Sequence, residues 1–144
     1  MKRVLVLFLM IFSFKQFAHE GHGEAPKDPS RFGGQLSNIV DSKKLTTKNN
    51  PSLFKSELIR SEDGTVRFYI FDLKMKDLDL ATFSQKIEAK IENHKNKINI
   101  NFELTKEGDH YTGKMPKINK RPFNLFFKLQ KEKQELFAGY DNLD

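Results

Sequence analysis

The sequence predicts an all-β protein, an antiparallel immunoglobulin-like sandwich of about seven to eight short strands. Apolar and polar residues alternate with a period of two through most of the chain beyond residue 32. Turn-forming residues separate these alternating segments at intervals of about 8–12 residues. No apolar pattern of helical spacing lasts longer than a turn or two. We expect Greek-key connections, and an open barrel is the alternative architecture.

The first half of the chain contains a strand followed by a hairpin. The first strand is expected to follow Phe32-Gly33-Gly34-Gln35. Residues 43–50 have the composition of a loop or a short edge strand. Residues 53–60 and 65–73 then form a hairpin through Ser61-Glu62-Asp63-Gly64, because the Asp-Gly pair supplies the positive φ of a tight turn.

The second half contains the clearest strand, residues 98–104, where large apolar residues alternate with polar ones. Residues 86–91 alternate in the same way, so the polar residues 92–97 are expected to join the two as a hairpin. Turns at residues 107–109 and 131–133 define the remaining strands, which are residues 110–114, 123–129 and 135–140. Residues 75–83 break the pattern and are expected to form a helical turn or an irregular crossover.

The core of this domain is expected to consist largely of phenylalanine, because the chain beyond the expected signal has ten Phe residues and no Trp. The absence of cysteine excludes a disulfide framework, so packing must stabilise the fold. The candidates for the centre of the core are Phe68, Phe71, Phe102, Phe123 and Phe127.

Residues 1–18 have the features of a secretory signal peptide. Lys2 and Arg3 precede the apolar residues 4–14, and the small residue Ala18 marks the expected cleavage site. This apolar stretch falls short of the roughly 20 residues that a membrane-spanning helix needs. We therefore expect a periplasmic or secreted protein without stable membrane insertion, and an uncleaved signal that anchors the protein in the membrane is the alternative.

The charge of the chain argues against a nucleic-acid partner. The formal net charge is +6, from 25 basic and 19 acidic residues, and loss of Lys2, Arg3 and Lys15 with the signal lowers it to +3. This excess is small and contains no long run of one sign.

A flexible leader, residues 19–31, is expected to precede the folded domain of residues 32–144. It begins with a tract rich in His and Glu and contains two prolines. Imidazole is a good ligand for Cu(II) and Zn(II), and carboxylates can complete the coordination shell. The candidate ligands are His19, Glu20, His22 and Glu24. Because ordering the leader costs conformational entropy, the ion should be loosely bound; the alternative is that the tract is only a soluble spacer.

Several other residues carry weaker signals. His110 follows Gly108-Asp109 and could join a metal site with the leader, whereas His94 is expected to be a solvated loop residue. Glu57 and Asp72 are expected to form structural ion pairs with Arg67 or Lys74. No phosphate-binding loop, nucleophile elbow or His-Glu-x-x-His helix is present, so we do not expect an enzyme.

A partner-binding surface is the other candidate site. Phe123, Leu125 and Phe127 lie on one face of their strand, and Phe126 and Lys128 lie on the other. An exposed aromatic ring beside a basic residue can contact a partner protein. The leader or residues 43–50 could instead cover Phe126.

The order of several short motifs resembles a family of small exported β-sandwich proteins associated with bacterial heavy-metal efflux systems. These motifs are the His-rich start, Gly33-Gly34, Glu57-Leu58-Ile59, the Asp63-Gly64 turn and Tyr69-x-x-Asp72. In that family a histidine often precedes the paired glycines, where this chain has Phe32. The resemblance implies a periplasmic accessory domain that binds metal or acts as an adaptor.

Two functions therefore remain open. The first is metal binding or handover, without catalysis, in an envelope efflux or homeostasis system, with an efflux protein as a possible partner. The second is a protein-interaction (adaptor) module of the cell envelope with no metal role. Replacement of His19 and His22 by alanine should abolish the first function and spare the second.

Overall fold

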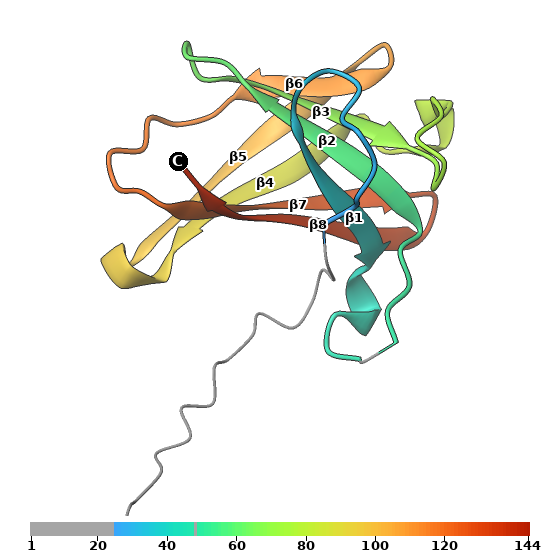
Figure 1. Ribbon diagram of the computed structural model, residues 1–144, viewed down its shortest axis with the longest axis horizontal. Coiled ribbons are helices and arrows are strands. Elements are labelled where there is room, and N and C mark those ends of the chain that lie inside the picture. Colours follow the sequence, from blue (N-terminus) through green and yellow to red (C-terminus); the bar gives the residue numbers. More distant parts are fainter. Residues whose placement is uncertain (1–24, 48) are drawn as a thin grey trace, which may run out of the picture.

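The computed structural model describes residues 25–47 and 49–144, and in this part of the chain eight antiparallel strands form a closed barrel (Figure 1). The expectation of an all-β antiparallel protein is confirmed. Three 3-10 turns accompany the strands: η1 (Ser42–Lys44), η2 (Leu80–Thr82) and η3 (His94–Asn96). The strands are β1 (Gln35–Asp41), β2 (Phe54–Arg60), β3 (Thr65–Phe71), β4 (Lys86–Asn93), β5 (Ile98–Glu107), β6 (His110–Lys114), β7 (Phe123–Lys131) and β8 (Gln134–Leu143).

The strands follow one another around the barrel in the order β1-β2-β3-β6-β5-β4-β7-β8. β4, β5 and β6 are neighbours joined by short turns, whereas β3 reaches β4, and β6 reaches β7, by long crossovers. β3 thus lies beside β6, and β7 beside β4, which confirms the expected Greek-key connections. The two crossovers, residues 72–85 and 115–122, lie at opposite ends of the barrel, on the right and the left of Figure 1.

The expected immunoglobulin-like sandwich is wrong, because the sheet closes on itself. β1 pairs with β8, from Ile39 opposite Ala138 to Asp41 opposite Leu136. β5 pairs with β6 from Thr105 opposite Thr112 to Glu107 opposite His110. These pairings satisfy backbone groups that two separate sheets would leave exposed at their edges, so a closed barrel has no free edge strand.

Three of the five expected phenylalanines lie in the core. Phe68, Phe123 and Phe127 are at most 2% exposed, and the rings of Phe68 and Phe127 lie 4.4 Å apart. Phe71 is also buried, but it contacts the Phe32 ring outside the main cluster. Phe102 is only partly buried at the edge of the core, so its expected central position is wrong.

The crossover of residues 72–85 closes one end of the barrel. Its side chains Leu80 and Phe83 are 4% exposed. The Lys106 ammonium group donates hydrogen bonds to the carbonyls of both residues, at 2.9 Å each. The Tyr111 hydroxyl donates to the Ser84 carbonyl at 2.6 Å. This segment contains the short turn η2, in agreement with the expected helical turn or crossover. The described residues include no helix long and apolar enough to cross a membrane.

The two buried tyrosines make stability sensitive to alkaline pH. Burial raises the pKa of Tyr111 to about 12, and it raises the pKa of Tyr140, whose hydroxyl lies 2.8 Å from that of Ser56, further still. An unfolded tyrosine loses its proton near pH 10, so above that pH the unfolded state binds fewer protons than the folded state. The free energy of unfolding should therefore be intact below about pH 10 and fall as the pH rises toward about 12.

Urea unfolding between about pH 8 and 11.5 would measure this loss. The Tyr111→Phe/Tyr140→Phe variant should start lower, by about 1 kcal/mol for each lost hydrogen bond, and then decline less steeply with pH. Equal pH dependence of both proteins would show that these tyrosines do not control the alkaline limit.

Candidate functional site

The four candidate metal ligands of the leader, His19, Glu20, His22 and Glu24, lie outside the described residues, as does the expected signal peptide. The fifth candidate, His110, begins β6, and its side chain is 20% exposed. Within residues 25–47 and 49–144, no three His, Asp or Glu side chains are grouped so as to hold a metal ion.

His110 is held by its neighbour in the sequence and by an aromatic ring. Its Nδ1 lies 2.9 Å from Oδ1 of Asp109. This hydrogen bond to His110 is the largest cause of a lowered pKa at Asp109, and the charge of Arg31 contributes to it. The imidazole also stacks on Tyr69, with ring centroids 4.9 Å apart. A ring that donates through Nδ1 to a carboxylate has its lone pair on Nε2, the arrangement typical of metal-ligating histidines.

The residues that lead into β1 are fastened to the barrel by Glu57. We call residues Arg31–Gly34 the strap. The Glu57 side chain is 0% exposed, and its two oxygens accept hydrogen bonds from three backbone N–H groups of the strap. The donors and distances are Arg31 at 2.8 Å, Phe32 at 2.9 Å and Gly34 at 2.7 Å.

Glu57 and Asp72 do not form the ion pairs that were expected with Arg67 or Lys74, and both carboxylates bond to backbone groups instead. Glu57 bonds to backbone N–H groups of the strap and not to Arg67 or Lys74. Asp72 accepts hydrogen bonds from the backbone N–H groups of Lys74 and Lys76, and these bonds lower its pKa. Each carboxylate therefore orders a backbone segment. Matching side chains of opposite charge in the sequence does not predict this role.

The two glycines of the strap answer two different requirements. Gly33 has a φ of +78°, in the left-handed region that favours glycine. At Gly34 a Cβ atom would lie 2.5 Å from the Leu58 carbonyl oxygen, so no side chain fits. The paired glycines thus meet the Glu57-Leu58-Ile59 strand directly, although the two motifs lie far apart in the sequence.

An aromatic surface extends from the strap to His110. Phe32, which is 46% exposed, packs on Tyr69 with centroids 4.4 Å apart, and Tyr69 in turn contacts His110. The Arg31 guanidinium lies over the Phe71 ring at 5.0 Å and forms an ion pair of 2.5 Å with Asp77 of the crossover. Asp28, which precedes the strap by three residues, forms an ion pair of 2.5 Å with Lys55 of β2. Of these residues, Arg31 lies near enough to the Asp109–His110 pair for its charge to lower the pKa of Asp109.

The expected partner-binding residues lie on the outer wall of β7. Phe126 is partly buried and stacks on Phe137 of β8 with centroids 5.5 Å apart. Lys128 is exposed, and both line a shallow depression of about 450 Å³ with residues of β4 and β5. Phe137 is the feature that the sequence pattern missed, because its partnership with Phe126 depends on the β7–β8 register.

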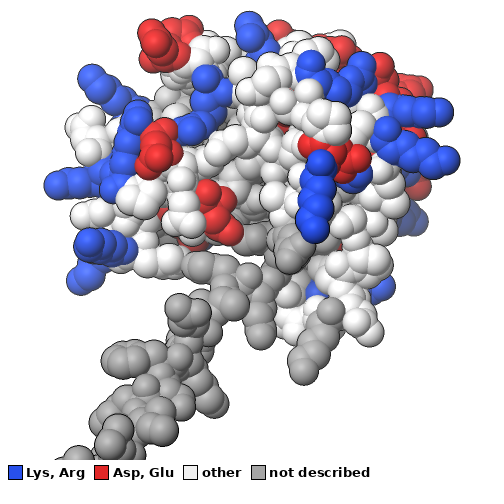
Figure 2. All heavy atoms as spheres, viewed as in Figure 1, with Lys and Arg blue, Asp and Glu red and all other residues white. Residues whose placement is uncertain are grey.

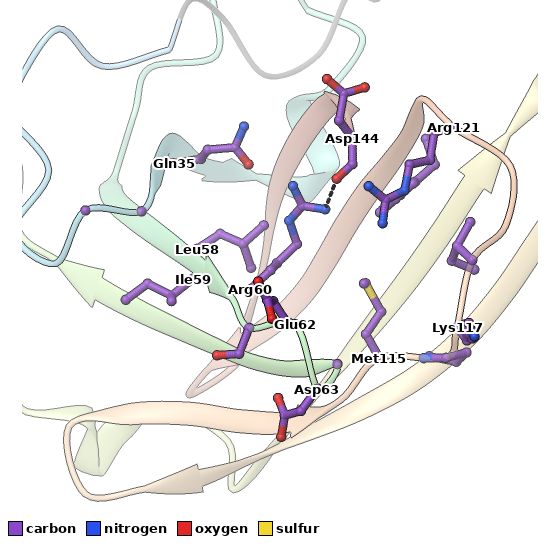
Figure 3. A pocket seen from close by; sticks show the side chains of 17 residues that line it. Gln35, Leu58, Ile59, Arg60, Glu62, Asp63, Met115, Lys117, Arg121 and Asp144 are labelled. Atoms are coloured by element: carbon purple, nitrogen blue, oxygen red, sulfur yellow. Dashed lines mark hydrogen bonds between the residues drawn. The ribbon is translucent and has the colours of Figure 1, made fainter.

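Sequence reasoning also missed a cleft at the end of the barrel opposite residues 72–85. It has a volume of about 680 Å³ and lies between the β2–β3 turn, the crossover of residues 115–122 and the last residue of the chain (Figure 3). Arg60 and Arg121 both line it. The sequence offered one signal for this cleft, because Arg121 begins the run of aromatic and basic residues that contains Phe126. It offered none for Arg60, which ends β2 and lies far from Arg121 in the sequence.

The strap should be one of the most sensitive points of the fold. The Glu57→Gln substitution replaces one carboxylate oxygen, which accepts hydrogen bonds, with an amide NH₂ group, which only donates them. This group would face the backbone N–H donors of the strap. We expect the free energy of unfolding to fall by about 3 kcal/mol, because buried donors lose their acceptor. Urea unfolding would measure it. Glu88→Gln, at an exposed position of β4, is the matched control and should change stability by no more than about 0.5 kcal/mol. Equal effects of the two substitutions would mean that the strap is not held by Glu57.

The chain matches no protein-family model, no curated protein and no solved structure. The resemblance to exported efflux-associated proteins therefore stays a prediction from the motifs.

Proposed function

We propose that this protein is a non-enzymatic accessory domain of the cell envelope that binds Cu(II) or Zn(II) and hands it on within an efflux or homeostasis system. In this proposal the chain is exported, the signal is removed after Ala18, and the leader supplies His19 and His22 as ligands. Glu20 and Glu24 add oxygen donors, and the barrel contributes His110.

The observation that carries the proposal is the Asp109–His110 pair beside the strap. The carboxylate fixes the imidazole through Nδ1, which leaves Nε2 available to an ion. The positive charge of nearby Arg31 is partly offset by its ion pair with Asp77. His110 is therefore oriented as a ligand from the barrel for an ion carried by the leader.

The length of the leader permits this arrangement. Asp28 is held by its ion pair with Lys55 of β2. In the strand register, Lys55 lies opposite Phe71 of β3, and Tyr69 of β3 lies opposite His110 of β6. Two strand spacings and two residues along the strand separate Lys55 from His110, roughly 12 Å. The six residues from His22 to Asp28 span up to about 20 Å when extended. His22 can therefore reach His110 without release of the strap.

Isothermal titration of Cu(II) and Zn(II) tests the proposal. The protein would begin at His19 and so retain all eight strands of the described structure. We expect micromolar or tighter binding, at least tenfold weaker in His19→Ala/His22→Ala and several-fold weaker in His110→Ala. Binding should also weaken as the pH falls through about 6.5, because protonated imidazole is not a ligand.

His94→Ala is the matched control, since His94 lies in the distant turn η3 and its side chain is 69% exposed. It should bind like the unmodified protein. Equal, weak binding by all variants would reject a metal role. Loss of affinity in the His19/His22 variant alone would keep the leader as a site and remove His110 from it.

The second candidate is an adaptor that docks an envelope protein on the Phe126–Phe137 pair. It is favoured by the stacked, partly exposed rings beside Lys128 on the outer wall. Docking there should survive His19→Ala/His22→Ala and be lost in Phe126→Ala/Lys128→Ala. Co-purification from envelope extracts with each variant distinguishes this candidate from metal handover.

A further inference from the structure

The two ends of the barrel differ in how they are filled. Leu80 and Phe83 fill the end crossed by residues 72–85. At the opposite end the cleft of about 680 Å³ lies between the β2–β3 turn and the crossover of residues 115–122. That volume is within the range of about 300–1,000 Å³ found for small-molecule sites, which often occur in the mouths of β-barrels.

The cleft has an apolar side. Leu58 and Phe123, which are each 2% exposed, are among the residues that line it. Met115 and Ile118 of the crossover are partly buried and pack against the core cluster. Figure 3 shows the Met115 side chain pointing into the cleft, below Arg60 and Arg121. An alkyl chain placed here would contact carbon and sulfur atoms on several sides.

Two arginines lie side by side at the mouth of the cleft. Arg60 donates from Nη1 to a main-chain oxygen of Asp144 at 2.9 Å, and its guanidinium lies 5.6 Å from the centre of the Phe123 ring. In Figure 3 the Arg121 guanidinium extends next to it. Burial lowers the pKa of Arg60, and the like charge of Arg121 lowers it further, whereas the charge of Asp144 raises it.

Three acidic residues, Glu62, Asp63 and Asp144, also line the cleft. Asp63 is occupied by Lys114, at 2.5 Å, and by Thr65. Glu62 lies on the β2–β3 turn, and the charge of Asp144 acts on Arg60 without a side-chain ion pair among the described residues. Lys117 adds a further positive charge to the lining. Two adjacent guanidinium groups are a suitable receptor for an oxyanion, because each presents paired N–H donors.

We propose that this cleft binds an amphipathic oxyanion, with the carboxylate or phosphate head between Arg60 and Arg121 and the alkyl chain over Met115, Ile118 and Phe123. The proposal does not rest on the metal-binding proposal, because neither His110 nor Phe32 lines the cleft; of the strap, only Gly33 and Gly34 do.

Titration followed by ¹H–¹⁵N NMR tests this site on the protein that begins at His19. The probes are decanoate and decyl phosphate, with decanol as the neutral chain and acetate as the head alone. Binding should shift the amide signals of Gly33, Gly34 and Gly64, which line the cleft. At least one of the two charged amphiphiles should bind about fivefold or more tightly than decanol, and acetate should bind far more weakly than either.

Arg121→Gln is the main variant, because Arg121 is exposed and its replacement should leave the fold intact. Affinity for the charged amphiphile should fall about tenfold, and Arg121→Lys should restore part of it. Arg67→Gln, an exposed arginine on the outer face of β3, removes the same net charge away from the cleft and should bind normally. The proposal fails if decanol binds as tightly as both charged probes, if Arg67→Gln loses as much affinity as Arg121→Gln, or if the glycine signals do not shift. Preference for decanoate over decyl phosphate, or the reverse, identifies the head group.

Discussion

The contact between Glu57 and the strap is the constraint on which the candidate surfaces of this barrel depend. A fully buried carboxylate needs several donors, and here three backbone N–H groups supply them. Because these donors belong to consecutive parts of one short segment, they fix its path across β2. That path places Phe32 on Tyr69 and Arg31 beside Asp77. The direction of the leader and the surroundings of His110 follow from it.

On the face shown in Figure 2, basic and acidic side chains alternate without a large region of one sign. Exposed pairs of this kind, such as Lys86 with Glu103, add little stability each. The arginine pair at the cleft differs from them, since its members share one sign and one of them is partly buried.

Local features of the fold could be predicted from the sequence, whereas its closure could not. Asp63-Gly64 predicted a tight turn, and Gly64 has a φ of +83° there. Alternation placed β4 and β5 in one hairpin because the signal and the contact are both local. The choice between sandwich and barrel depends on whether β1 meets β8, strands from opposite ends of the chain. Inward-facing apolar residues alternate in the same way in both architectures. For the same reason the sequence showed that Asp109 and His110 are neighbours, whereas the hydrogen bond between them and the proximity of Arg60 to Arg121 were not predicted.

The strap changes how the paired glycines should be understood. A side chain at Gly34 would collide with the Leu58 carbonyl oxygen. The N–H group of Gly34 donates a hydrogen bond to Glu57, which lies 23 positions later in the sequence. Gly34 and Glu57 therefore form one structural unit, because a change of either residue would disturb the same contact. Between them in the sequence lies the β1–β2 connection, which contains the short turn η1, so differences in their spacing are expected there. A sequence pattern that couples the two, with a gap of adjustable length, should recover distant members of this fold that overall similarity does not detect.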